Sequence, residues 1–327
     1  MSDPYRSSTR NNNIALKYFD DVKAVAGAQT NLYSKNAAVK DPINCSALFL
    51  HGMGGSPVET SMKESMESAL NIGAFRKVYA LENMLLSATC DMDMPRNILD
   101  ANLDNHTAGL KAGLLELEKY PDFMNSEKTL GFHSLGAWAF VKAILEDKYF
   151  CRFVDRVVFY APYTLTADKL LDSKRKYVKR KKSEDFEKVI MKSYAKPRFI
   201  EGVECKFPTC AKVVLNELDP KWRSHDENGI QINNLPIISR KASMLFSFRG
   251  LRRVPLYVIL PTADTMAEFQ QTYELFRSFK WDLKTIQCIP DANHFFDNKP
   301  QELRIVLDEC VFGKIHQEYL EKNRGGG

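Results

Sequence analysis

Short apolar runs alternate with longer segments of helical periodicity along most of the chain. Runs of five or six mainly apolar residues occur at Ser46–Leu50, Lys77–Leu81, Glu127–Phe132, Arg156–Tyr160, Pro255–Leu260 and Lys284–Ile289. Buried parallel strands have this appearance when helices connect them. The pattern therefore predicts an α/β fold, with a mostly parallel sheet flanked by helices.

Apolar residues at helical spacing fill the intervals between these runs. Ser56-Pro57-Val58-Glu59 reads as a capping box with proline at the first helical position, so a helix is predicted to begin there. Further helices are predicted at 99–117, which Pro121 ends, at Gly136–Glu146, at Met266–Phe276, and from Pro300 through Val311.

The alternation of strands and helices breaks down between residues 163 and 250. We interpret this segment as a cap inserted between two strands of the sheet. Residues 44–162 and 251–324 would then form the α/β core. Residues 1–43 are predicted to contain a polar tail followed by β-like fragments that suggest an edge hairpin.

The composition is that of an ordinary soluble globular protein, with 44% hydrophobic and 27% charged residues among 327. The first residues lack the apolar core of a signal peptide, and no run of about 18 apolar residues could span a bilayer. We expect a cytoplasmic protein.

The seven cysteines indicate reduced thiols, and Cys205 and Cys210 have no partners at zinc-ligand spacing, so neither a metal nor a cofactor is expected.

Ser134 lies in a predicted strand–turn–helix, within the sequence TLGFHSLG at residues 129–136. A serine at such a turn projects its hydroxyl out of the sheet, and the helix behind it offers unpaired amides, here that of Leu135. A simpler interpretation is a strand end followed by a helix cap. The first interpretation makes Ser134 a candidate nucleophile.

Asp264 and His294 each follow directly after a predicted strand, in the segments LPTAD and IPDANHFF. A serine hydroxyl needs a base to become nucleophilic, and the base needs an acid to orient it. Because ligand sites of α/β sheets lie where the strands' carboxyl ends converge, these side chains are predicted to meet Ser134 there. His294 would be the base and Asp264 the orienting acid.

A glycine-rich loop, HGMGGS at residues 51–56, follows the first buried strand. Its glycines allow a tight turn and a close approach to substrate. The amide of Met53 could join that of Leu135 as an oxyanion hole, with His51 and Gly52 in the same substrate-binding loop. A phosphate-binding loop is disfavoured, because no Lys-Ser/Thr follows and the dinucleotide glycine spacing is absent.

In these features the sequence resembles the α/β-hydrolase superfamily over residues 44–162 and 254–320. The segment IPDANHFFDNKPQEL, residues 289–303, is similar to the histidine loop and last helix of small esterase-like members. The resemblance implies triad roles for Ser134, Asp264 and His294 and an oxyanion role for the amides of Met53 and Leu135. Some lipase-like relatives carry the orienting acid of the triad earlier in the sequence, which makes Asp168 the alternative to Asp264.

Two positions depart from the superfamily pattern. Phe132 stands where a small residue usually precedes the serine by two, with Gly131 displaced by one, and Pro261 replaces a common glycine in the acid loop. A ring at residue 132 needs space beside the turn. This departure favours an alternative, a catalytically weak or inactive binding protein with the same fold.

The net charge of +5 is concentrated in one segment. Residues 168–198 contain 12 Lys or Arg against 5 Asp or Glu, with the densest run at residues 174–182. Such a run is usually a solvated face, and it would also attract an anionic substrate group or a membrane surface.

No nucleic-acid partner is expected, since Tyr177 is the one aromatic residue in the run. The expected partner is a small acyl substrate, hydrolysed or, alternatively, transferred to an alcohol.

Overall fold

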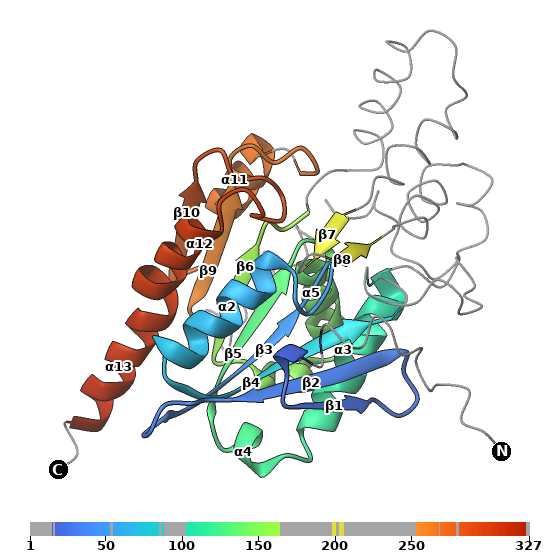
Figure 1. Ribbon diagram of the computed structural model, residues 1–327, viewed down its shortest axis with the longest axis vertical. Helices are drawn as coiled ribbons and strands as arrows, with labels where there is room; N and C mark the ends of the chain where they lie inside the picture. The colour runs from blue at the N-terminus through green and yellow to red at the C-terminus, as the bar shows by residue number, and fades with distance from the viewer. Residues whose placement is uncertain are drawn as a thin grey trace, which may run out of the picture.

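The computed structural model describes residues 15, 17–52, 55–84, 87, 103–163, 253–267, 269–278 and 281–324, and the main chain of 198–200 and 203–205. Eight strands form one sheet in the order β1-β2-β4-β3-β5-β6-β9-β10 (Figure 1). They are β1 (Asp21–Ala24), β2 (Thr30–Asn36), β3 (Ile43–Leu50), β4 (Phe75–Asn83), β5 (Glu127–His133), β6 (Arg156–Tyr160), β9 (Leu256–Pro261) and β10 (Lys284–Ile289).

The six strands from β4 to β10 in this order are parallel to one another. These are the six strands predicted from the apolar runs, and the predicted mostly parallel sheet is confirmed. β1 and β2 form an antiparallel hairpin at the edge, and β2 pairs antiparallel with β4. The carboxyl ends of the six parallel strands consequently lie along one rim of the sheet.

Helices cover both faces of the sheet (Figure 1). The described α-helices are α2 (Thr60–Asn71), α3 (Leu103–Leu117), the one-turn α4 (Pro121–Met124), α5 (Leu135–Glu146), α11 (Phe269–Ser278), α12 (Pro300–Val306) and α13 (Gly313–Arg324). A 3₁₀ segment spans Lys148–Phe153, and a π-helical segment, Leu307–Phe312, joins α12 to α13. This arrangement is the predicted α/β fold, a mostly parallel sheet flanked by helices.

Alternation along the strands divides the core into two layers. In β3, Leu48 and Leu50 face the layer of α3, α5 and α11, whereas Ala47 and Phe49 face the layer of α2, α12 and α13. All four side chains are at most 1% exposed. Because both faces of β3 are covered, the strand is apolar throughout, as expected for a central parallel strand.

The helix predicted to begin at Pro57 begins three residues later, at Thr60. The capping box is present in part, since the amide of Val58 donates to Ser56 Oγ at 3.2 Å and the amide of Ser56 donates to Glu59 Oε2 at 3.3 Å. Glu59 keeps an extended conformation, with φ −66° and ψ 158°. Its side chain turns inward to another partner, described below, and the helix starts only after it.

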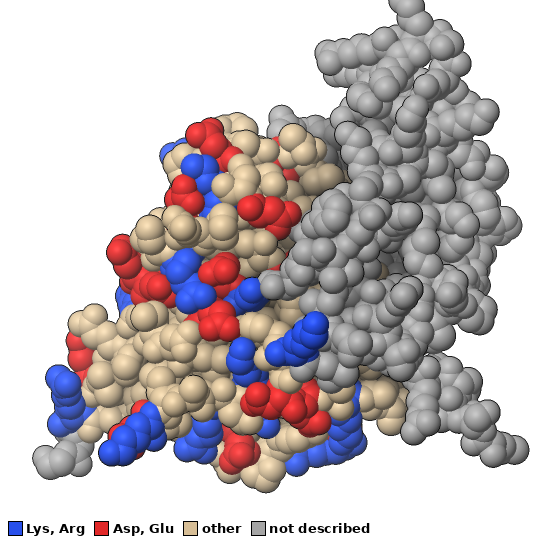
Figure 2. Space-filling model, in the orientation of Figure 1, with Lys and Arg blue, Asp and Glu red and all other residues tan. Residues whose placement is uncertain are grey.

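Between β6 and β9, which pair directly, the chain forms a separate two-stranded antiparallel sheet of β7 (Arg198–Ile200) and β8 (Val203–Cys205). The basic run at 174–182 and Asp168 lie outside the described residues. On the described face in Figure 2, acidic and basic side chains are interspersed. None of the helices within the described ranges is long and apolar enough to cross a membrane.

Candidate active site

Ser134 occupies a sharp turn between β5 and α5. Its φ of 52° and ψ of −117° lie outside the helical and extended regions. A non-glycine residue there is strained, and such strain persists only where the surrounding structure enforces it. Here the amide of Ser134 donates to the carbonyl of Tyr160 on β6 at 2.9 Å, and α5 begins at the next residue. The turn therefore presents the hydroxyl at the rim of the sheet.

Two glycines allow the neighbouring loop to approach this turn. A Cβ on Gly52 would lie 2.5 Å from Ser134 Cβ, and a Cβ on Gly136 would lie 2.9 Å from the carbonyl oxygen of Leu50. Side chains at either position would force the β3 loop and the serine turn apart. The close contact between the loop after β3 and the serine turn therefore requires glycine at both positions.

His294 lies between Ser134 and Asp264. Its Nε2 is 2.8 Å from Ser134 Oγ, and its Nδ1 is 2.7 Å from Asp264 Oδ2. Asp264 Oδ1 accepts hydrogen bonds from the amides of Met266 at 2.7 Å and Ala267 at 2.9 Å, which fix the plane of the carboxylate. The structure therefore brings together the three side chains that the sequence placed after three separate strands.

The pairing determines where the imidazole carries its proton. The Asp264 carboxylate can only accept, so Nδ1 of His294 donates to it and Nε2 is left to accept from the Ser134 hydroxyl. Burial lowers the pKa of His294, and the nearby Asp264 opposes this effect without reversing it. The histidine is consequently neutral near pH 7, the form that can act as a base.

The loop after β3 is held in place by the ring and main chain of His51. The amide of Asn83 donates to His51 Nε2 at 3.2 Å, so the proton is on Nδ1, which lies 2.6 Å from the carbonyl of Gly52. His106 Nε2 donates to the carbonyl of His51 at 3.0 Å. His51 is fully buried and shapes the loop. Met53, the expected second oxyanion donor, lies outside the described residues.

Leu135, the other expected oxyanion donor, is the first residue of α5. The amide of the first helical residue has no partner within its helix, and the positive end of the helix dipole favours an anion there. Its amide is thus placed beside Ser134, where a developing oxyanion would require a donor.

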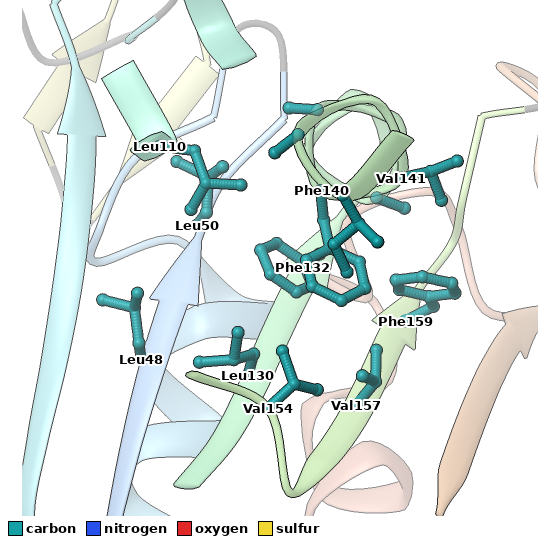
Figure 3. Close-up of a cluster of buried hydrophobic side chains, with 14 of the residues drawn as sticks. Leu48, Leu50, Leu110, Leu130, Phe132, Phe140, Val141, Val154, Val157 and Phe159 are labelled. Atoms are coloured by element: carbon teal, nitrogen blue, oxygen red, sulfur yellow. The ribbon is translucent and has the colours of Figure 1, made fainter. Parts of the chain in front are cut away.

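Phe132 is accommodated in the core below the turn. Its ring is fully buried and stacks on Phe140 of α5, with centroids 4.5 Å apart and planes 23° apart (Figure 3). Because Gly131 has no side chain, the ring of Phe49 fits beside it. A Cβ at residue 131 would lie 2.4 Å from that ring. The bulky residue is therefore compatible with the hydrogen-bonded arrangement of Ser134, His294 and Asp264.

Sequence reasoning did not identify two buried groups that adjoin this site, Glu59 and His133. Glu59 Oε1 lies 2.7 Å from His133 Nδ1, and both side chains have no exposed surface. The available signals were the glutamate at the end of the capping box and the histidine beside Ser134. Among the described residues, no group of three or more His, Cys, Asp or Glu is arranged to hold a metal ion.

No model of a known protein family matches the sequence, and no curated protein matches it. Solved structures do resemble the fold. Haloalkane dehalogenase DbeA from Bradyrhizobium elkani superposes with a TM-score of 0.58 at 12% identity, covering 91% of this chain and 98% of that one. Est1E from Butyrivibrio proteoclasticus, with ferulic acid bound, gives 0.52 at 13% identity over 90% and 99%. The peroxisomal α/β-hydrolase Lpx1 from Saccharomyces cerevisiae gives 0.51 at 12% over 88% and 82%.

Proposed function

We propose that this protein, which has the α/β-hydrolase fold, is a serine hydrolase that cleaves a carboxylic ester or thioester through an acyl-enzyme on Ser134. The observation that carries the proposal is the hydrogen-bonded chain from Ser134 Oγ through His294 to Asp264, with distances of 2.8 Å and 2.7 Å. A buried histidine between a strained serine and a buried carboxylate is the arrangement that nucleophilic acyl transfer requires.

The reaction would proceed in two half-reactions. Ser134 Oγ attacks the acyl carbon while His294 Nε2 takes its proton, and the negative charge passes to the carbonyl oxygen near the Leu135 amide. His294 then gives the proton to the leaving alcohol or thiol as its bond to the acyl carbon breaks. In the second half, His294 takes a proton from a water molecule as the water oxygen attacks the acyl carbon, and it returns the proton to Ser134 Oγ as the bond from that carbon to Oγ breaks, which releases the acid and restores Ser134.

Asp264 stabilises the imidazolium that forms in both half-reactions. Its carboxylate is buried, with 3% of the side chain exposed, and its second oxygen is occupied by two amides. It is therefore held in one orientation, so His294 keeps its Nδ1 proton and directs Nε2 at the serine. Asp264 is therefore the acid of the proposed mechanism, and the alternative acid, Asp168, lies outside the described residues.

The basic segment suggests a preference for anionic substrates. A lid carrying the run at 174–182 would attract an acyl substrate with a carboxylate or phosphate, such as a coenzyme A thioester or a phospholipid head group. Replacing Lys179, Lys181 and Lys182 with glutamine should raise KM for anionic acyl substrates and leave neutral esters unaffected. Unchanged kinetics on both classes would remove the preference from the proposal.

A fluorophosphonate probe tests the nucleophile without knowledge of the natural substrate. The wild-type protein should be labelled stoichiometrically, Ser134→Ala should not be labelled, and Ser278→Ala, which removes an exposed hydroxyl at the end of α11, should label as the wild type does. An unlabelled wild type would instead favour the binding-protein alternative. Product analysis with added alcohols then separates a hydrolase from an acyltransferase.

A further inference from the structure

A glutamate and a histidine form a buried pair directly behind the proposed triad. His133 is the last residue of β5 and precedes Ser134, and Glu59 is the residue before α2. Their side chains have no exposed surface, and Glu59 Oε1 lies 2.7 Å from His133 Nδ1. Neither takes part in the reaction steps described above.

The hydrogen bonds of His133 determine its protonation. Nε2 lies 2.9 Å from the main-chain carbonyl of His294, and because a carbonyl oxygen only accepts, Nε2 carries a proton. Nδ1 faces Glu59 Oε1 at 2.7 Å, and if neither atom carried a proton their lone pairs would repel each other at this distance. A second proton is therefore present in the pair, either on Nδ1 or on Glu59.

The surroundings of Glu59 favour the ionised carboxylate. Ser61 Oγ donates to Glu59 Oε1 at 3.0 Å, and the amide of Ser56 donates to Oε2 at 3.3 Å. The carboxylate also lies at the N-terminal end of the 12-residue helix α2, where the helix dipole stabilises negative charge. Donors to a carboxylate stabilise its charged form, so the second proton belongs on His133, as an imidazolium.

The pair connects three parts of the site. Glu59 fixes the start of α2 and the end of the loop after β3, where Gly55 leaves room for it: a Cβ on Gly55 would lie 2.5 Å from Glu59 Oε2. His133 is bonded through the peptide to Ser134, and its ring donates to the carbonyl of His294. The ring of His294 lies 5.0 Å from that of His133, between centroids.

We propose that Glu59 and His133 form a buried ion pair that positions the catalytic histidine. The imidazolium of His133 holds the main chain of His294, and Glu59 keeps His133 charged and oriented. This inference rests on the proposed serine-hydrolase function and adds two positioning residues to it. A buried charge is costly unless it is paired, so the two residues are expected to depend on each other.

The charges of the pair also act on His294 in opposite directions. The cation of His133 lowers the pKa of His294, and the anion of Glu59 raises it. Among the described residues, His51 after β3 also interacts electrostatically with both members of the pair. Asp264 after β9 pairs with His294, and Asp297 after β10 accepts a hydrogen bond from Thr60, the residue after Glu59. With both members of the pair present, their effects on the pKa of His294 oppose each other.

The pH dependence of fluorophosphonate labelling tests the pair. Labelling accelerates with pH as His294 loses its proton. In His133→Asn the unpaired Glu59 raises the pKa of His294, so the acid limb of the profile should move to higher pH and labelling at neutral pH should slow about tenfold. Glu59→Gln should also label more slowly, with no upward movement of the limb.

The double variant Glu59→Gln/His133→Asn separates positioning from simple structural damage. Removing both charges should bring the acid limb back toward the wild-type position, because neither charge then acts on His294. Glu64→Gln, on α2 where the partly buried Glu64 pairs with Arg304 of α12, is the matched control and should leave rate and limb unchanged. A His133→Asn limb that coincides with that of a labelled wild type would overturn the proposal.

The protonation of His133 can be observed without kinetics. In wild-type protein labelled with ¹⁵N-histidine, one of the six histidines should carry protons on both ring nitrogens at pH 8. That signal should be absent from His133→Asn and from Glu59→Gln. If all six are neutral at pH 8, the ion pair is wrong whatever the labelling results. A wild type that is not labelled at all contradicts the proposed function and leaves this measurement to decide the ion pair.

Discussion

The two ends of the parallel strands use charged side chains in different ways. At the carboxyl ends, Asp264 and His294 keep 3% and 4% of their side-chain surface exposed. At the amino end of β5, Glu127 pairs with Arg156 at 2.9 Å and with Lys322 of α13 at 2.6 Å, and the lysine is 72% exposed. Solvent screens the ion pairs of Glu127 but not the buried pair of Asp264 and His294. Charge at the carboxyl ends can therefore direct a proton, whereas charge at the amino end contributes modestly to stability.

The largest effect expected at the carboxyl ends is that of Asp264→Asn. The amides of Met266 and Ala267 require an acceptor, so the new carboxamide should turn its oxygen to them and its NH₂ to His294. His294 would then accept at Nδ1 and carry its proton on Nε2, where it cannot receive the serine proton. We expect the labelling rate to fall by about 10⁴.

Asp291→Asn is the matched control for this change. Asp291 is an exposed residue in the histidine loop with a φ of 57°, a conformation that asparagine tolerates. Its labelling rate should equal that of the wild type. Equal rates for Asp264→Asn and the wild type would show that His294 is oriented by another group, for which Asp168 is the candidate.

A smaller loss is expected when the close approach of the two loops is disturbed. In Gly52→Ala the new Cβ would meet Ser134 Cβ at 2.5 Å, so the serine turn or the β3 loop must shift. Displacements of about 1 Å in a reacting group cost on the order of 100-fold in rate, and we expect a loss of that size in labelling. Thermal unfolding measured in parallel should show a loss of about 1–3 kcal/mol. Full-rate labelling would mean that the loop moves freely.

The pH dependence of the wild type follows from the burial of His294. Burial lowers its pKa in spite of Asp264, so the imidazole remains a neutral base below the ordinary histidine pKa of about 6.5. The acid limb of the labelling rate should therefore be centred below about pH 6.5. An acid limb centred above the ordinary histidine value would contradict this account of the site.

The smallest effect is expected at the amino end of β5. Burial would raise the pKa of Glu127, but hydrogen bonds from Lys322 and Arg156 outweigh it, so the pKa is lowered. When a carboxyl group has a lower pKa in the folded state than in the unfolded state, its ionisation stabilises the protein at pH values above the unfolded-state pKa. This stabilisation is lost as the pH falls through the folded-state pKa. Glu127→Gln should cost less than about 1 kcal/mol of unfolding free energy at pH 7, and the difference from the wild type should shrink on acidification. Labelling should be unaffected.

The sequence predicted the parallel sheet and the three side chains at its rim, because both depend on local patterns. Apolar runs identify buried strands, and Ser134, Asp264 and His294 each follow one of them. The Glu59–His133 pair was not predicted, since it joins positions that only the folded sheet brings together. The same reason explains the late start of α2: a capping signal is local, and the carboxylate that should complete it has a more distant partner.

Mapping the site of covalent modification tests the central claim most directly. Wild-type protein treated with a fluorophosphonate is digested, and the modified residue is identified by tandem mass spectrometry. We predict a single adduct on Ser134, formed at a rate that drops sharply in Asp264→Asn. An adduct on another residue, or intact protein that remains unmodified after prolonged treatment, would contradict a nucleophilic role for this serine.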